Sequence, residues 1–196
     1  MWNVLIACEF SGVVRKAFNH YPGVNAMSCD LLPDAEGSKN HYQGDVRDVL
    51  YDHWDLMIAH PPCTRLANSG NRWRKGKERE EQEALDFVQM LMDAPIPRIA
   101  IENPVGIISS RIRKPDQIVQ PWMFGDEATK TTCLWLKQLP HLRPSLVVGR
   151  GERSITKSGR SLPKWYNLPP SPERAAIRST TFPGFAAAMA EQWSNL

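Results

Sequence analysis

Short apolar runs recur along the chain and alternate with longer amphipathic stretches. A continuous apolar run of a few residues, closed by proline, glycine or polar residues, is typical of a strand that is buried on both faces. The runs that we expect to form strands are 4–8, 23–28, 41–46, 56–59, 99–101 and 132–136, with 146–148 as a further candidate. Their number and spacing suit one central sheet.

Three stretches have the spacing of amphipathic helices. These are 13–21, 78–92 and a C-terminal segment, 175–193, whose helix follows Pro183 and Gly184. The stretch 78–92 also opens with acidic residues, which suits the positive end of a helix dipole. Strands that alternate with helices predict an α/β fold, with a mostly parallel sheet and helices on both faces. We expect residues 1–196 to form a single domain.

Composition narrows the class of protein. Hydrophobic residues make up 42% of the chain and charged residues 23%, which is typical of a soluble globular protein. No apolar run approaches the length of a membrane span, and the N-terminal residues predict a first strand rather than a signal peptide. The four cysteines are far apart and form no CxxC pair, which argues against zinc or disulfides and fits a reducing cytoplasm. We therefore expect a cytoplasmic monomer without a metal or a membrane partner.

The stretch from Asp55 to Thr64 holds the first candidate for chemistry. Its apolar strand ends at Pro61 and Pro62, because neither proline can donate a hydrogen bond to a sheet. Cys63 follows at once, so its thiol is expected at the carboxyl end of a central strand, where open α/β sheets bind ligands. A lone cysteine is more often simply buried beside a loop, so the rest of the chain has to decide between that alternative and a nucleophile.

Glu102 ends another apolar strand and is followed by Asn103 and Pro104. If the two strands are neighbours, the thiol of Cys63 and the carboxyl group of Glu102 meet in one cleft. A protease would need a histidine base beside its thiol, whereas a thiolate next to a carboxylic acid suits addition to a conjugated ring. Asn103 could orient the acid or hold the loop, and an Asn-Pro pair also favours a plain turn.

The turn Phe10-Ser11-Gly12 between the first strand and the first helix is a candidate cofactor cradle, with Ser11 as the expected N-cap. Asp30 ends the second strand, where an acid can accept hydrogen bonds from ribose hydroxyls, although it could equally be a turn residue. Asp45 has a similar ambiguity. It could bind an adenine amino group or cap the segment before Arg47.

Basic residues gather in two segments. The first, 64–79, follows Cys63 directly and contains Trp73 among Arg65, Arg72, Arg74, Lys75, Lys77 and Arg79. Its charge favours contact with DNA phosphates, and the alternative is a solvated loop. The second, 149–172, is rich in Pro, Ser, Gly and basic residues. It could be a flexible linker or a loop that lies on phosphates.

Several of these stretches together resemble a known family. Ala7-Cys-Glu-Phe-Ser-Gly12, Pro61-Pro-Cys63 and Glu102-Asn103 are similar, in order and spacing, to the first, fourth and sixth motifs of the DNA (cytosine-5)-methyltransferases. The runs 110–117, 125–136 and 178–190 resemble the small phage- and prophage-encoded branch of that family. The resemblance covers nearly the whole chain.

The resemblance implies a Rossmann-like, S-adenosylmethionine-dependent enzyme that acts on double-stranded DNA. The target cytosine would be flipped out of the duplex, Cys63 would add to C6, Glu102 would contact N3, and C5 would receive the methyl group. The residues implied at the cofactor are Phe10, Ser11, Gly12, Asp30, Asp45 and Pro61; those implied in catalysis are Cys63, Glu102, Asn103 and Lys130; those expected on DNA are Arg65, Arg72, Trp73, Arg74 and Lys75. Lys130 stands in for the family's Arg-x-Arg element, and residues 140–172 for its target-recognition region.

An alternative function is compatible with the same residues. A catalytically inactive relative, or one that uses a modified cofactor, could bind DNA or a free pyrimidine nucleotide. The presence of both Cys63 and Glu102 favours the enzyme, because a protein that only binds DNA has no need of either.

Overall fold

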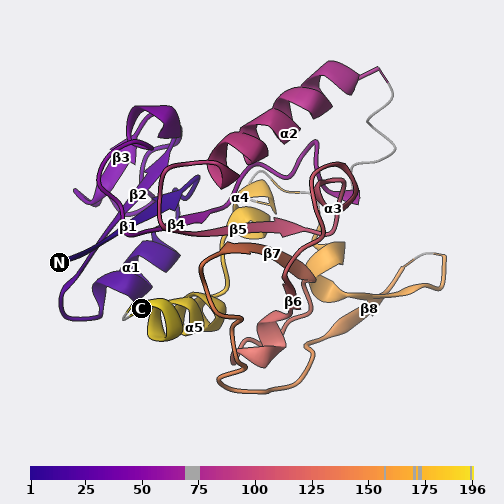
Figure 1. Ribbon diagram of the computed structural model, residues 1–196. Helices are drawn as coiled ribbons and strands as arrows, with labels where there is room; N and C mark the ends of the chain where they lie inside the picture. The colour runs from indigo at the N-terminus through magenta and orange to yellow at the C-terminus, as the bar shows by residue number, and fades with distance from the viewer. Residues whose placement is uncertain (69–75, 157, 170, 172–173, 195) are drawn as a thin grey trace.

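A seven-stranded sheet in the order β3-β2-β1-β4-β5-β7-β6 forms the centre of the molecule (Figure 1). The computed structural model describes residues 1–68, 76–156, 158–169, 171, 174–194 and 196. The sheet contains β1 (Trp2–Ala7), β2 (Val24–Asp30), β3 (His41–Gln43), β4 (Leu56–Ala59), β5 (Arg98–Pro104), β6 (Gln117–Val119) and β7 (Thr132–Lys137). The helices are α1 (Val13–Asn19), α2 (Glu78–Met92), α3 (Ile108–Arg111), α4 (Arg174–Ser179) and α5 (Pro183–Trp193).

The sheet is mostly parallel, as the alternation of strands and helices predicts. β2, β1, β4 and β5 pair in parallel, and β3 pairs in parallel with β2. β7 is antiparallel to both of its neighbours, β5 and β6. This is the doubly wound order of dinucleotide-binding sheets with one antiparallel strand inserted between β5 and β6. The antiparallel direction is possible because β6 returns to β7 through a loop and a short 3-10 helix (Pro121–Met123) instead of a crossover helix.

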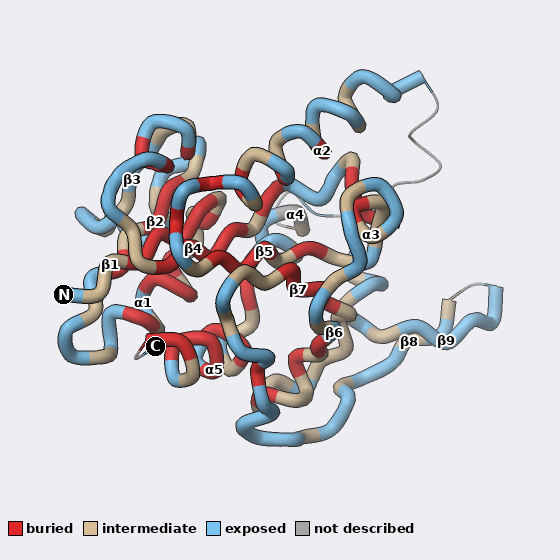
Figure 2. The backbone as a smooth tube through the Cα atoms, in the orientation of Figure 1, coloured by how far each residue is buried: buried red, intermediate tan, exposed pale blue. Residues whose placement is uncertain are grey.

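Helices cover both faces of the sheet. Alternate side chains of β1 enter different clusters: Leu5 packs with the α2 side chains, and Ile6 packs with α1 and α5. Figure 1 shows α2 on one side of the sheet and α1 and α5 on the other. In Figure 2 the strands form the buried centre between these layers. Because the central strands are buried on both faces, only their ends can present side chains to a substrate.

The helix at 78–92 has the predicted bounds, and its buried residues are Leu85, Val88 and Leu91. The predicted C-terminal helix is confirmed as α5, which begins at Pro183 and ends at Trp193, and the prediction missed the separate short helix α4 that precedes it. The candidate strand at 146–148 is wrong: Leu146 forms only an isolated bridge with Phe124. The three-residue strand β6 was not predicted, because half-exposed strands of this length carry no apolar run.

The segment 149–172 contains a β-hairpin rather than a plain linker. β8 (Arg153–Ile155) pairs antiparallel with β9 (Ser161–Pro163), and a 3-10 helix follows at Lys164–Asn167. The hairpin projects from the body on the side toward which β5 points (Figure 1), and its chain is largely exposed (Figure 2). Among the described residues, no helix is both long enough and apolar enough to cross a membrane.

Candidate active site

The candidate site lies where β1 and β4 end side by side. The chain leaves this pair toward β2 on one side and toward β5 on the other, so it is the switch point of the sheet, where doubly wound folds bind ligands. Cys8, directly after β1, has a φ of 60°, a left-handed conformation that a cysteine rarely adopts. Such backbone strain clusters at functional sites, so it agrees with a site at this edge.

Cys63 follows β4 on a loop that is tied to the end of β5. The buried Asn103 donates a hydrogen bond from Nδ2 to the carbonyl oxygen of Pro61 at 2.7 Å. Beyond Cys63, the carbonyl oxygen of Leu66 accepts a hydrogen bond from the amide of Ile107 at 2.9 Å. Of the roles considered for Asn103, holding the loop is the one that the hydrogen bond supports. Cys63 itself is exposed, so the alternative of a simply buried cysteine is wrong.

Glu102 lies beside the cysteine loop because β4 and β5 are neighbours. Ala59 pairs with Ile101, so the next residues, His60 and Glu102, leave their strands together. The Glu102 side chain is 12% exposed, and its Oε2 accepts a hydrogen bond from Nδ1 of His60 at 3.1 Å. Burial opposes ionisation of Glu102, but the His60 hydrogen bond, the charges of Lys130 and His60 and a hydrogen bond from Thr132 outweigh it and lower its pKa. Glu102 is therefore a carboxylate at neutral pH.

The environment of Cys63 holds its thiol protonated. Although Cys63 is exposed as a residue, the protein atoms around its sulfur partly desolvate it, and this desolvation and the negative charge of Glu102 raise the thiol pKa. The positive charges of Lys130 and Arg178 act in the opposite direction. These couplings show that the thiol, the carboxylate and two cations converge on one region. A small cavity beside Glu102 is lined by Lys130 and by residues of β7 and α5, among others Thr132 and Phe185.

Lys130 is held in place by the C-terminal part of the chain. Its Nζ donates to the carbonyl oxygen of Arg178 at 3.3 Å and lies 5.6 Å and 6.0 Å from the ring centres of Trp165 and Phe182. Sequence reasoning named Lys130 but not His60, Thr132 or Arg178. His60 stands directly before Pro61, and only the strand register shows that it faces Glu102.

The turn after β1 differs from the prediction in its cap. Gly12, with a φ of 68°, is the N-cap of α1, and Ser11 is not. The buried carboxylate of Glu9 reaches over the turn and accepts hydrogen bonds from the amides of Val14 at 2.7 Å and Arg15 at 3.2 Å. The positive end of α1 is therefore already satisfied by a carboxylate, and a bound phosphate would have to displace it.

The two aspartates predicted at the cofactor lie near this turn. Asp30 ends β2, and its Oδ1 accepts a hydrogen bond from the amide of Leu32 at 2.9 Å. Asp45 accepts from the amide of Arg47 at 2.9 Å and pairs with its guanidinium at 2.8 Å, so it caps the segment before Arg47. After burial, the charges of Asp30 and Asp45 are among the causes that raise the pKa of the Cys8 thiol. The region between Asp30 and Cys8 is therefore electronegative.

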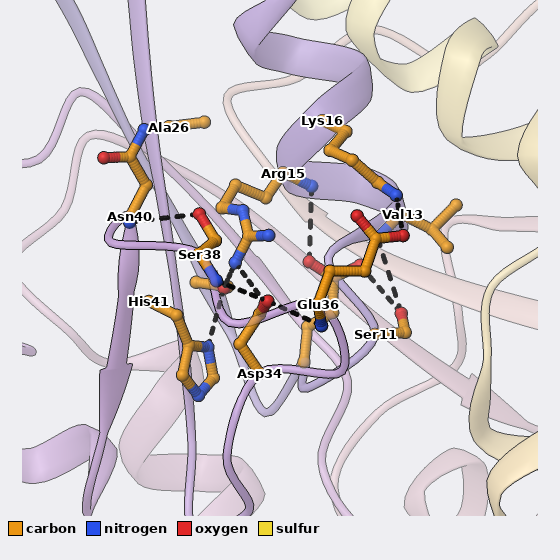
Figure 3. Close-up of polar contacts among 12 residues, drawn as sticks. Ser11, Val13, Arg15, Lys16, Ala26, Asp34, Glu36, Ser38, Asn40 and His41 are labelled. Atoms are coloured by element: carbon orange, nitrogen blue, oxygen red, sulfur yellow. Dashed lines mark hydrogen bonds and ion pairs between the residues drawn. The ribbon is translucent and has the colours of Figure 1, made fainter.

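A buried ion pair fixes the loop that follows Asp30 (Figure 3). Arg15 and Asp34 meet at 2.6 Å, and each side chain is only 3% exposed. The Arg15 guanidinium also donates to the hydroxyl of Ser28 at 2.7 Å, and that hydroxyl lies 2.8 Å from Nδ1 of His41. The loop also reaches the predicted cradle, because the carbonyl oxygen of Phe10 accepts a hydrogen bond from the amide of Ala35. Asp30 and Phe10 are thus held on one rigid frame.

The basic segment after Cys63 is described only in part. Arg72, Trp73, Arg74 and Lys75 lie outside the described residues. Arg65 donates to the carboxylate of Glu80 at 2.7 Å, and Lys77 reaches the same carboxylate at 2.6 Å. These two cations are therefore paired with α2 in the free protein. Surface pairs of this kind are weak, so phosphates can replace Glu80.

Two basic side chains of the hairpin region have polar partners within that region. Arg153 donates to the hydroxyl of Ser161 at 2.9 Å, and Lys164 pairs with Glu152 at 2.6 Å. In the described part of the chain, all four cysteines are free and no group of three or more His, Cys, Asp or Glu side chains is placed to hold a metal ion.

Comparison with known proteins adds little about activity. No family model matches the sequence, and no curated protein is significantly similar to it. One solved structure with a similar fold is a prophage-encoded protein from E. coli that has been proposed to be a DNA modification methyltransferase. It shares 18% identity at a TM-score of 0.47, over 77% of this chain and 53% of its own. The chain thus spans about half of that neighbour, and its substrate and reaction have to be inferred from its own side chains.

Proposed function

We propose that the protein is a DNA (cytosine-5)-methyltransferase in which Cys63 is the nucleophile and Glu102 holds the target base. The observation that carries the proposal is the parallel pairing of β4 and β5. It brings Cys63, an exposed residue, and the buried carboxylate of Glu102 into electrostatic contact at the switch point of the sheet. A thiol and a carboxylate without a histidine on the thiol suit addition to a pyrimidine ring better than acyl transfer.

In the proposed reaction the cytosine enters the site flipped out of the duplex. The Cys63 thiolate adds to C6, and the electron pair of the C5–C6 double bond becomes available at C5. C5 would take the methyl group that S-adenosylmethionine supplies, and the cofactor would leave as a neutral thioether. The C5 proton would then pass to water, its electron pair would re-form the C5–C6 double bond, and the C6–S bond would break to release the thiolate. Lys130 faces the same region and stabilises the negative charge that develops on the ring.

The ionised state of Glu102 defines how it holds the base. In the free protein it has no proton to give, so it accepts a hydrogen bond from the exocyclic amino group of cytosine. Glu102 is one of the groups that raise the pKa of Cys63. A hydrogen bond from the base to the Glu102 carboxylate would therefore weaken the effect of its negative charge on the thiol. Binding of the base therefore promotes ionisation of the nucleophile, and the resting thiol stays unreactive.

The cofactor region fits S-adenosylmethionine, which supplies an electrophilic methyl group when bound. Asp30 and Asp45 make the region electronegative, which favours a sulfonium cation. Glu9 already satisfies the positive end of α1, which disfavours the phosphates of a nucleotide cofactor. Asp30 would hold the ribose hydroxyls, while Phe10, Ser11, Gly12 and Pro61 would line the rest of the site. Asp45 would contribute through its charge, since both of its oxygens are engaged with Arg47.

DNA contact is proposed for the two basic segments that border the site. Arg65 lies on the loop of the nucleophile, and Arg72, Trp73, Arg74 and Lys75 remain predictions for the same contact. The β8–β9 hairpin has the dimensions of a two-stranded ribbon, a shape that fits the major groove of B-DNA. We assign to it and its flanks, residues 140–172, the reading of the DNA sequence.

A trapping experiment tests the proposal. Duplex DNA that contains 5-fluorocytosine blocks release of the enzyme, because C5 then carries fluorine in place of the proton that must leave. We expect a covalent adduct by mass spectrometry that maps to Cys63, requires S-adenosylmethionine and is absent from Cys63→Ser. DNA binding without an adduct or methyl transfer would support the alternative of an inactive relative. Methyl transfer that survives Cys63→Ser would rule out the covalent mechanism.

A further inference from the structure

His60 lies directly against the proposed catalytic carboxylate, although the proposed reaction gives it no role. Its backbone amide donates to the carbonyl oxygen of Ala7 at 2.9 Å, which fixes the residue between the ends of β1 and β4. Its side chain is 8% exposed, and its Nδ1 lies 3.1 Å from Oε2 of Glu102. Its Nε2 is buried and has no hydrogen-bond partner among the residues that the structure describes. A buried nitrogen without a partner costs free energy, so the residue calls for a functional explanation.

The contact with Glu102 defines the tautomer of the imidazole. An ionised carboxylate can only accept hydrogen bonds, so Nδ1 must carry the proton. In the neutral ring Nε2 is then an acceptor. His60 thus presents one donor to Glu102, and that donor is the largest of the influences that keep Glu102 ionised against its burial.

We propose that His60 is a positioning residue, which aims the Glu102 carboxylate at the target base through its Nδ1–H donor. The inference rests on the function proposed above. It implies that residues 60–63 act together: Cys63 is the nucleophile at one end, and His60 at the other end orients the carboxylate of Glu102. Pro61 and Pro62 make the connection between the two ends rigid.

The other groups around Glu102 and Cys63 determine how a change at His60 is transmitted. Lys130 and Thr132 face Glu102 from the start of β7, and Cys133 on β7 also feels its charge. Arg178 on α4 faces Cys63. Without the His60 donor, burial favours the protonated form of Glu102. The Cys63 thiol then loses a nearby negative charge, while the positive charges of Lys130 and Arg178 remain.

Two opposite effects are therefore expected in His60→Phe. Methyl transfer falls about 10- to 100-fold in kcat, the loss expected for one charge-assisted hydrogen bond, with KM for DNA changed less than threefold. Alkylation of Cys63 by iodoacetamide at pH 7, in the absence of DNA, becomes several-fold faster, because its thiol ionises more readily. A purely structural defect would not move these two rates in opposite directions while leaving the rest of the protein protected.

Substitutions by amides test the role of the individual nitrogen. In His60→Asn the amide nitrogen is at the same bond separation from Cβ as Nδ1, so it can still donate to Glu102. In His60→Gln the nitrogen is one bond further away, at the separation of Nε2. We expect His60→Asn to keep methyl transfer within about threefold of the wild type and Cys63 alkylation unchanged, and His60→Gln to behave like His60→Phe.

Alkylation of the buried Cys29 on β2, mapped in the same digest, reports whether each variant is folded, because the pKa of its thiol is raised by burial and by Asp30, Asp45 and Asp48 rather than by Glu102. Equal kcat values for His60→Phe and the wild type, or a His60→Asn variant as impaired as His60→Phe, would overturn the inference. If the wild type transfers no methyl group, the proposed function fails, while the alkylation rates of the three variants still test whether His60 keeps Glu102 charged.

Discussion

The buried Arg15–Asp34 ion pair provides the sharpest test of the electrostatics of this fold. The perturbation is Asp34→Asn, which keeps the size of the side chain and removes its charge. In the wild type the carboxylate accepts hydrogen bonds from Arg15 at 2.6 Å and from the amides of Glu36 and Ser38 at 3.0 Å and 2.9 Å. Figure 3 shows these contacts at the base of the loop between β2 and β3. Asp34 therefore fastens that loop to α1.

The magnitude follows from the pKa of Asp34. Burial opposes ionisation, but the hydrogen bonds and the charge of Arg15 outweigh it and lower the pKa from 3.8 to about 2. A shift of this size corresponds to about 2 kcal/mol of stability at neutral pH. Since the folded-state pKa is the lower one, the stabilisation is fully present above about pH 4 and is lost as the pH falls toward 2. The variant also leaves Arg15 buried without its carboxylate, so the total loss is about 2–4 kcal/mol at pH 7.

Urea denaturation, followed by circular dichroism at pH 7, 5 and 3, measures this loss. We expect Asp34→Asn to lower the free energy of unfolding at pH 7 and pH 5, with the difference from the wild type becoming smaller at pH 3. Glu36→Gln is the matched control on the same loop, because its pair with Lys16 has the same 2.6 Å distance but is half exposed. Exposed pairs contribute about 0–1 kcal/mol, so this control should change little.

Two results would refute the reasoning about Asp34. One is a loss at pH 7 no larger than that of Glu36→Gln, which would mean that burial of the pair adds nothing. The other is a difference between Asp34→Asn and the wild type that stays constant from pH 7 to pH 3. It would mean that the ionisation of Asp34 does not contribute to the stability of the folded state.

Two further substitutions test the cysteine loop and the DNA surface. In Gly106→Ala the new Cβ would clash with the carbonyl oxygen of Leu66, so the cysteine loop must shift and radiolabelled methyl transfer should fall at least about tenfold. Gln82→Ala, at an exposed position of α2, is the control and should leave methyl transfer unchanged. In Glu80→Gln the cation of Arg65 loses its pair. DNA binding should therefore tighten, and the slope of log K against log salt concentration should steepen by about one unit. An unchanged slope in a salt titration would show that Arg65 does not reach a phosphate.

The sequence predicts the parts of the fold that repeat a strong local pattern. The helix at 78–92 is recognisable because its apolar residues recur on one face and its first turn is acidic. The buried strands β1, β4 and β5 are recognisable as apolar runs. β4 has the predicted bounds, whereas the edges of β1 and β5 move by one to three residues because polar ends pair as well as apolar centres. The direction of β7 has no such signal. It depends on the connection from β6, whose residues are compatible with either direction.

The candidate site is predictable where it depends on strand ends. Cys63 and Glu102 converge because both follow central strands that turn out to be neighbours. The cap of α1 shows the opposite case. Ser11 is the better N-cap by residue type, but the left-handed Gly12 turns the chain so that Glu9 reaches the helix amides first. Such a contact depends on three-dimensional geometry, and residue preferences alone cannot reveal it.

Negative and positive side chains lie at different places along the carboxyl edge of the sheet, and their separation distinguishes the two ends of the candidate site. Asp30 and Asp45 make the ends of β2 and β3 negative, while Lys130 and Arg178 bring positive charge to Cys63. A cationic methyl donor and an anionic DNA strand would then approach from opposite ends and meet at the end of β4. Glu102 lies at that meeting point and raises the pKa of the thiol until a base occupies it. Under the proposed function, the arrangement that would direct the two substrates also keeps the Cys63 thiol protonated until a base binds.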